Sequence, residues 1–299
     1  MLSEKSSKSK RGAGQWAVAW RRFKRNKSAL IGSAIVVFFL AVALLAPFIA
    51  PYPPRSYASL YEGDAGLGPS WKHPFGVEDS GIDVFSEVIA GTRNDLYVGL
   101  AATFITTIIG VALGAVAGYF KGIISDVLLG ITQIFFVIPT LLLILLFARV
   151  FSFLVFKGLG LTLIVLILAF FGWSSISFIV RGEVLRIKEM DFVQAARSIG
   201  ADTNRILFRH IVPNILSPVI VVSTLNIAGF ILTEVVVSFL GFGDPNTATW
   251  GLLLNEGFSF VRTDWWVSLF PGLAVVFCVL GFNLMGDGLS DALNPRLRE

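Results

Sequence analysis

The side chains that most often carry catalysis or bind metals are few in this chain and far apart. There are two histidines, His73 and His210, and one cysteine, Cys278. A single cysteine excludes a disulfide scaffold and a cysteine-ligated metal cluster. The segment Gly172–Ser175 places serines in an apolar stretch, but no histidine lies in such a stretch to activate one as a nucleophile. We therefore predict no catalytic residue, no metal site and no cofactor bound by this chain, which argues against an intramembrane protease.

The sequence also lacks the phosphate-binding loop of common ATPases. That loop ends in a Gly-Lys pair whose lysine reaches the phosphates, and no Gly-Lys pair occurs in the 299 residues. Any transport driven by ATP would therefore take its energy from another subunit.

One carboxylate, Glu234, stands almost alone in a long apolar stretch. A charged group is costly in lipid, so such a residue usually faces a bundle interior or a watery cavity. Ser223, Asn226 and Thr233 lie on roughly the same helical face. This face could line a solute path or its gate; alternatively, Glu234 pairs with a neighbouring helix. The sequence favours neither interpretation.

The elements that must position these residues are membrane helices. The chain is 55% hydrophobic and 15% charged, whereas soluble domains carry roughly 25% charged residues. This composition excludes an ordinary soluble enzyme and a disordered chain. We predict an all-α, polytopic membrane protein, because six stretches are long and apolar enough to span hydrocarbon. They are residues 28–50, 96–119, 126–150, 161–180, 214–241 and 266–286.

The distribution of charge predicts how the chain crosses the membrane. Most of the 24 lysines and arginines fall in segments that an even number of spans would place on one side, while the segment 51–95 is rich in acids and prolines. Basic residues concentrate on the cytoplasmic side, so the net charge of +4 reflects topology and not binding to nucleic acid. The predicted organisation is a cytoplasmic tail (1–27), a first helix (28–50), an extracytoplasmic segment (51–95), a five-helix core (96–290) with a cytoplasmic loop (182–213), and a cytoplasmic tail (291–299).

Three glycines, Gly110, Gly114 and Gly118, recur at a spacing of four in the second predicted span. This spacing places them on one helical face, where a neighbouring backbone can approach closely. We expect them to serve helix packing.

The polar stretch between the fourth and fifth spans predicts a helix, a turn and a second helix at the membrane surface. Phe192, Ala195, Ala196 and Ile199 share one helical face, and Gly200 supplies the turn. Asp202 or Thr203 would cap a second short helix, which would contain Ile206, Leu207 and His210. A loop of this length with an apolar stripe of its own predicts a docking surface.

Several motifs resemble those of a known transporter family. Gln194-Ala195-Ala196, followed by Gly200 and His210–Asn214, is similar to the Glu-Ala-Ala loop of ABC importer permeases. Further matches to the C-type permeases of the dipeptide, oligopeptide and nickel importers are Arg25–Lys27, His73–Gly76 with Gly81 and Asp83, Ser238–Gly243, Phe282–Gly288 and Pro295-Arg296. The resemblance covers nearly the whole chain. It departs at Gln194, where the family usually has Glu, and at Ile82, where many relatives have Arg.

The resemblance implies the type I permease fold of ABC importers and a place in the cell membrane. Implied partners are a homologous permease, two ATP-binding subunits that use ATP and Mg, an extracytoplasmic solute-binding protein and the lipid bilayer. The implied contacts with the ATPase are Asp191, Gln194, Ala195, Ala196, Gly200, Ala201 and Asp202. The implied solutes are dipeptides or oligopeptides, with nickel complexes, glutathione or oligosaccharides as alternatives. A secondary transporter is less consistent with the sequence, since it would carry more ionisable residues within its spans.

Overall fold

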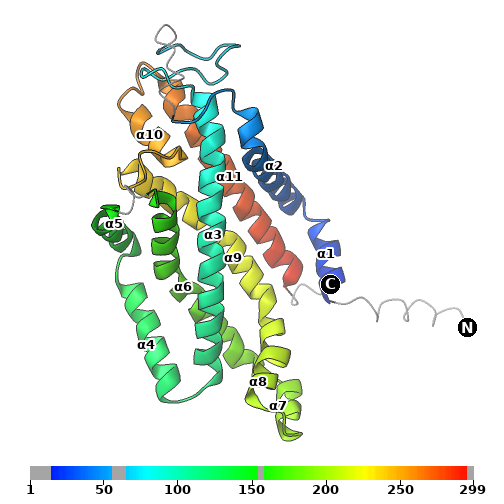
Figure 1. Ribbon diagram of the computed structural model, residues 1–299. Helices are drawn as coiled ribbons and strands as arrows, with labels where there is room; N and C mark the ends of the chain where they lie inside the picture. Colours follow the sequence, from blue (N-terminus) through cyan, green and yellow to red (C-terminus); the bar gives the residue numbers. More distant parts are fainter. Residues whose placement is uncertain (1–14, 56–64, 154–157, 295–299) are drawn as a thin grey trace, which may run out of the picture.

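The computed structural model describes residues 15–55, 65–153 and 158–294, and over these ranges it is a helical bundle without a β-strand (Figure 1). Residues 1–14 of the predicted basic tail therefore lie outside the described residues. The predicted C-terminal tail lies outside them from residue 295 onward. The helices are α1 (Gln15–Phe23), α2 (Lys27–Ile49), α3 (Val84–Tyr119), α4 (Ile123–Val137), α5 (Thr140–Val150), α6 (Gly160–Ile187), α7 (Asp191–Ser198), α8 (Thr203–Arg205), a π-helical turn (Ile206–Ile211), α9 (Val212–Phe239), α10 (Trp250–Phe258) and α11 (Trp265–Leu293).

The all-α membrane fold predicted from the sequence is confirmed. Among the described residues, five helical segments are long and apolar enough to cross a membrane: α2, α3, α6, the segment Thr203–Phe239 that contains α9, and α11. The bent pair α4 and α5 is long and apolar enough if its two helices are taken as one span, and the described residues then contain six candidate spans.

The third apolar stretch predicted at residues 126–150 is present, but it consists of two helices and not of one. The chain breaks there between α4 and α5, whose axes differ by 86°. Pro139 explains the break, because it has no N–H to donate and forces the preceding residue out of the helical region. Ile138 accordingly has an extended backbone with φ −86° and ψ 129°.

The helix α3 begins earlier than the sequence suggests, inside the segment 51–95 that is predicted to be extracytoplasmic. Asp83 starts it at Val84, because the Asp83 carboxylate accepts a hydrogen bond of 2.8 Å from the Ser86 amide. The polar residues Glu87 and Asp95 interrupt the apolar pattern of the first turns, yet both are buried in the protein.

The centre of the bundle is α3, which contributes to each of the three large apolar clusters (Figure 1). One cluster joins it to α2, α9, α10 and α11, and a second joins it to α5, α6 and α9. The third lies at the α7 end of the bundle and joins α3 to α6, α7, the π-helical turn and α9.

The three spaced glycines lie where α3 packs on α6. A Cβ on Gly110 would lie 2.7 Å from Ile176 Cβ, one on Gly114 2.5 Å from the Ser177 carbonyl oxygen, and one on Gly118 2.7 Å from Val184 Cβ. Any larger residue would force the two backbones apart. The glycines therefore set the close approach of α3 and α6.

Candidate functional site

The loop between α6 and α9 forms a compact turn at one end of the bundle (Figure 1). Gly200 follows α7 with φ +82°, a left-handed conformation that favours glycine. Its amide donates to the Arg197 carbonyl at 3.0 Å, and the Ala201 amide donates to the Ala196 carbonyl at 3.1 Å. This pair of bonds is the Schellman arrangement that ends many helices, so the turn predicted at Gly200 has a defined geometry.

The helix α7 has one face in the protein and one face in solvent. Val193 is buried in the third cluster with Ile187 and Ile211, and Ala196 is also buried. Ala195 and Ile199 are exposed, and 86% of Ile199 is accessible. The apolar face predicted from the sequence is therefore divided, because Ala196 turns inward.

An apolar surface surrounds the exposed side of α7. Its members are large side chains with at least a third of their surface accessible, and we call them the α7 patch: Met190, Phe192, Ile199 and Phe208. Exposed apolar groups that gather at one place on a surface mark interaction sites. The remaining predicted contact residues, Asp191 and Asp202, are also exposed, while Ala201 is half-buried.

The separate second helix predicted in this loop is wrong. Ile206, Leu207 and His210 belong to a π-helical turn that runs directly from α8 into α9. Pro213 explains the wider turn, since a proline near the start of α9 cannot donate to the carbonyl of Arg209. Asp202 stands at the start of α8, but its side chain makes no capping hydrogen bond.

Gln194 points back into the loop. Its amide group donates to the Lys188 carbonyl at 3.0 Å, and its Nε2 lies 3.4 Å from a carboxylate oxygen of Glu189. A glutamate at this position could accept but not donate, so it could not make the bond to Lys188.

The four polar residues predicted to share a face of α9 do not converge. Ser223 is within 2.8 Å of the Thr107 hydroxyl on α3, and Asn226 is half-buried. Thr233 bonds to the carbonyl of Gly229 in its own helix and lines a cavity between α5, α6 and α9. Glu234 is fully buried elsewhere.

The position of Glu234 corresponds to the second interpretation of this residue, a carboxyl packed against a neighbouring helix. It accepts a hydrogen bond of 2.6 Å from Ser238, and the buried carboxyl of Asp95 on α3 is a neighbour. Asp95 also accepts from the Trp250 amide at the start of α10, at 2.9 Å. Sequence reasoning missed Asp95, although an aspartate one residue before a predicted span was a visible signal.

Comparison with known proteins shows which family has this sequence. The sequence profile described as "Binding-protein-dependent transport system inner membrane component" matches residues 110–299, which include α7 and its turn. The chain belongs to this family. A second profile, "N-terminal TM domain of oligopeptide transport permease C", matches residues 14–66.

Curated relatives of this permease match over nearly its whole length. The oligopeptide transport system permease protein OppC of Bacillus subtilis is 35% identical, over 97% of this chain and 93% of that protein. The dipeptide transport system permease protein DppC of the same organism is 37% identical, over 94% and 85%. The glutathione transport system permease protein GsiD of Pectobacterium atrosepticum is 35% identical, over 95% and 92%.

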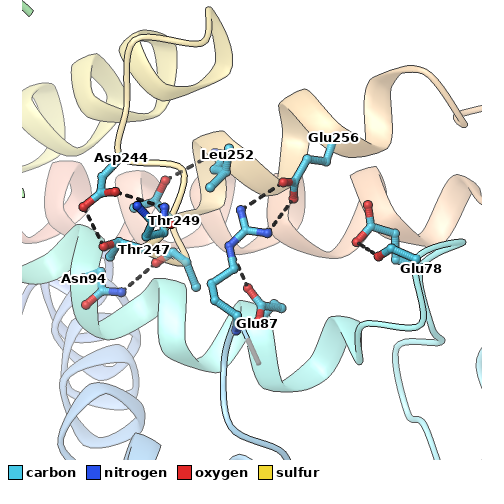
Figure 2. A network of polar contacts seen from close by, with 12 residues as sticks. Glu78, Glu87, Asn94, Asp244, Thr247, Thr249, Leu252 and Glu256 are labelled. Atoms are coloured by element: carbon cyan, nitrogen blue, oxygen red, sulfur yellow. Dashed lines mark hydrogen bonds and ion pairs between the residues drawn. The ribbon is translucent and has the colours of Figure 1, made fainter. Parts of the chain in front are cut away.

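At the opposite end of the permease from α7, a polar network fixes the segment before α3 to the bundle (Figure 2). Arg55 makes two hydrogen bonds to the Glu256 carboxylate, at 3.0 and 3.1 Å, and its backbone amide donates to the buried Glu87 at 2.6 Å. Nearby, Glu78 is mostly buried, and its pKa is raised by that burial and by the charge of Glu256. No motif or periodicity in the sequence marks this network.

The same end of the permease holds the start of α10. Thr249 caps that helix by accepting from the Leu252 amide at 3.3 Å, and Asp244 accepts from the Thr247 hydroxyl at 2.9 Å. The Asn94 amide of α3 donates to the Ala248 carbonyl at 2.6 Å (Figure 2). The bonds of Asn94 and Asp95 attach the start of α10 to α3, and the other two order the loop and cap the helix.

Proposed function

We propose that this permease forms a solute path with a second, homologous permease and imports short peptides that an external binding protein delivers. Two separate ATPase subunits supply the energy, and they dock on the α7 patch and the exposed side of α7. Both termini and the α7 loop lie on the cytoplasmic side in this proposal.

The observation that carries the docking proposal is the exposed side of α7. The helix is too short to be stable alone in water, so its buried residues Val193 and Ala196 must hold it to the bundle. The opposite side presents Ala195, whose small side chain allows another surface to come close, next to the apolar Phe192 and Ile199. The exposed side also carries the polar residues Asp191, Arg197 and Ser198. A helix that is fixed on one side and presents both apolar and polar side chains on the other suits insertion into a groove of a partner.

The solute class is proposed from the relatives. The three that are compared above carry the names of oligopeptide, dipeptide and glutathione transporters, and all of these solutes are short peptides or peptide derivatives. This supports peptides over the nickel complexes and oligosaccharides that the sequence left open. The length of the peptide is set in this proposal by the binding protein.

The test is reconstitution of the permease with its partner permease, the two ATPases and the binding protein in proteoliposomes. We expect ATP-dependent uptake of a labelled dipeptide, a labelled longer peptide or glutathione, and none of a labelled oligosaccharide or a nickel chelate. Uptake of only the last two would refute the peptide assignment.

A variant tests the docking surface separately. Ala195→Asp places a charge on the exposed side of α7, so we expect the ATPases no longer to co-purify with the permease pair. Thr263→Asp is the matched control, because it adds the same charge at an exposed site beside α10 and α11, at the other end of the bundle. Wild-type ATPase binding by Ala195→Asp would refute docking on α7.

A further inference from the structure

Lys188 is a buried lysine at the end of α6, and neither the predicted contacts nor the proposed docking surface includes it. Only 5% of the residue is exposed, and its ammonium donates to the Gly118 carbonyl at 2.8 Å. Burial lowers the pKa of this ammonium, and the neighbouring charge of Lys121 lowers it further. A lysine is seldom buried to this extent unless it is paired, so the contact with Gly118 requires an explanation.

The acceptor is the end of α3. A helix leaves its last four carbonyls without partners inside the helix, and a cation is favourable there because of the helix dipole. In α3, the Ala117 carbonyl accepts from the Ser125 hydroxyl at 2.8 Å and the next one, Gly118, accepts from Lys188. Lys188 therefore caps a carbonyl at the end of α3, although it lies 70 residues away in sequence.

The backbone of Lys188 faces the other way, toward α7. Its carbonyl accepts the hydrogen bond from the Gln194 side chain at 3.0 Å. A continuous polar connection thus runs from Gln194 on α7, through both ends of Lys188, to Gly118 on α3.

This connection matters because α7 packs mainly against the π-helical turn and not against α3. Apolar contacts such as those of Val193 are not directional and allow a short helix to slide, whereas hydrogen bonds to a backbone carbonyl fix direction. Beside the apolar contacts of the third cluster, Lys188 supplies a hydrogen-bonded connection between α7 and the end of the central helix.

We propose that Lys188 is a positioning residue that transmits a displacement of α7 to α3. The inference rests on the proposed docking of the ATPases on α7. When the ATPase subunits move α7, Gln194 pulls on the Lys188 backbone, and the Lys188 ammonium carries the displacement to the Gly118 carbonyl. Lys188 touches neither solute nor nucleotide in this scheme.

The experiment uses the full complex in proteoliposomes and measures peptide uptake per ATP hydrolysed, together with the amount of ATPase bound. Lys188→Met keeps an unbranched side chain, one atom shorter than that of lysine, and donates no hydrogen bond. We expect bound ATPase to be unchanged and uptake per ATP to fall by about tenfold, as loss of a hydrogen bond to a charged group would give. Lys188→Arg keeps the donors and should recover a large part of the coupling.

Lys121→Met is the matched control, because it removes an exposed charge from the same end of the bundle. Removal of the Lys121 charge favours the charged form of Lys188, so this variant should not lower uptake per ATP. If Lys188→Met fails to assemble, Gln194→Leu decides, since it breaks the α7 half of the connection and leaves the buried lysine in place. A purely structural role for Lys188 would lower the yield of complex but leave uptake per ATP of the assembled fraction at the wild-type value.

The outcomes separate this inference from the function that it rests on. If the wild-type complex shows no ATP-dependent uptake, the proposed function fails. If the wild type transports and both Lys188→Met and Gln194→Leu retain wild-type uptake per ATP, the inference about Lys188 is refuted and the proposed function stands.

Discussion

Replacement of Gly200 by alanine tests whether the turn after α7 is needed for ATPase docking. The residue has φ +82°, and a Cβ at this position meets no atom within 4 Å. The cost of the substitution is therefore a backbone cost, about 1–2 kcal/mol for an alanine in the left-handed region. Since every 1.4 kcal/mol is a factor of ten, the fraction of molecules with the native turn can fall by up to about 5- to 30-fold. The apparent affinity for the ATPase falls by the same factor, because only that fraction presents α7 correctly.

The chain contains a matched control for this substitution. Gly241 has φ +83°, a Cβ added there would also meet no atom within 4 Å, and the residue ends α9 with the same two hydrogen bonds, each of 3.0 Å. Gly241→Ala should therefore lower thermal stability about as much as Gly200→Ala.

The assay is titration of the permease pair in nanodiscs with the ATPase, alongside thermal unfolding of each variant. We expect weaker ATPase binding for Gly200→Ala only, and partial recovery for Gly200→Asn, because asparagine tolerates the left-handed region better than alanine. The reasoning is refuted if the two alanine variants bind the ATPase equally well.

Three further substitutions test the packing and the polar network. Gly114→Leu should prevent α3 from packing on α6, because even a Cβ would lie 2.5 Å from the Ser177 carbonyl oxygen; gel filtration should then show little intact permease. Arg55→Ala should leave the buried Glu87 carboxylate without its cation and cost about 3–5 kcal/mol, measured as the loss of unfolding free energy relative to Arg55→Lys. Glu78→Gln should raise thermal stability at neutral pH, because the raised pKa of Glu78 means that its charged form is disfavoured in the folded state. That gain in thermal stability should shrink as the pH falls toward the ordinary pKa range of glutamate. A gain that grows on acidification would contradict a raised pKa for Glu78.

The membrane helices were predictable because lipid imposes a simple requirement on the sequence. Each span must be long, apolar and internally hydrogen-bonded, so composition alone locates α2, α6 and α11. Most of the ends of these helices lie within a few residues of the predicted ends. The turn at Gly200 was predictable for a similar reason, since few residues other than glycine accept its backbone angles. The break before α5 could also have been inferred from Pro139.

The long-range polar contacts were not predictable. Glu87 and Asp95 lie in the segment predicted to be extracytoplasmic, yet both are buried and accept hydrogen bonds from residues far away in sequence, Arg55 and Trp250. The contact of Lys188 with Gly118 likewise follows no periodic rule. Such pairs depend on which helices become neighbours, and hydrophobic periodicity carries no information about that choice.

The length of α3 has a consequence for how the two sides of the membrane communicate. Its 36 residues extend over about 54 Å, whereas the hydrocarbon layer is about 30 Å thick. The helix contains no proline, so it has no built-in joint between the cap at Asp83 and the carbonyl of Gly118. In the proposed coupling scheme, a displacement of the Gly118 end therefore reaches the Asp83 end through one continuous helix, without a relay of rearranging side chains inside the lipid.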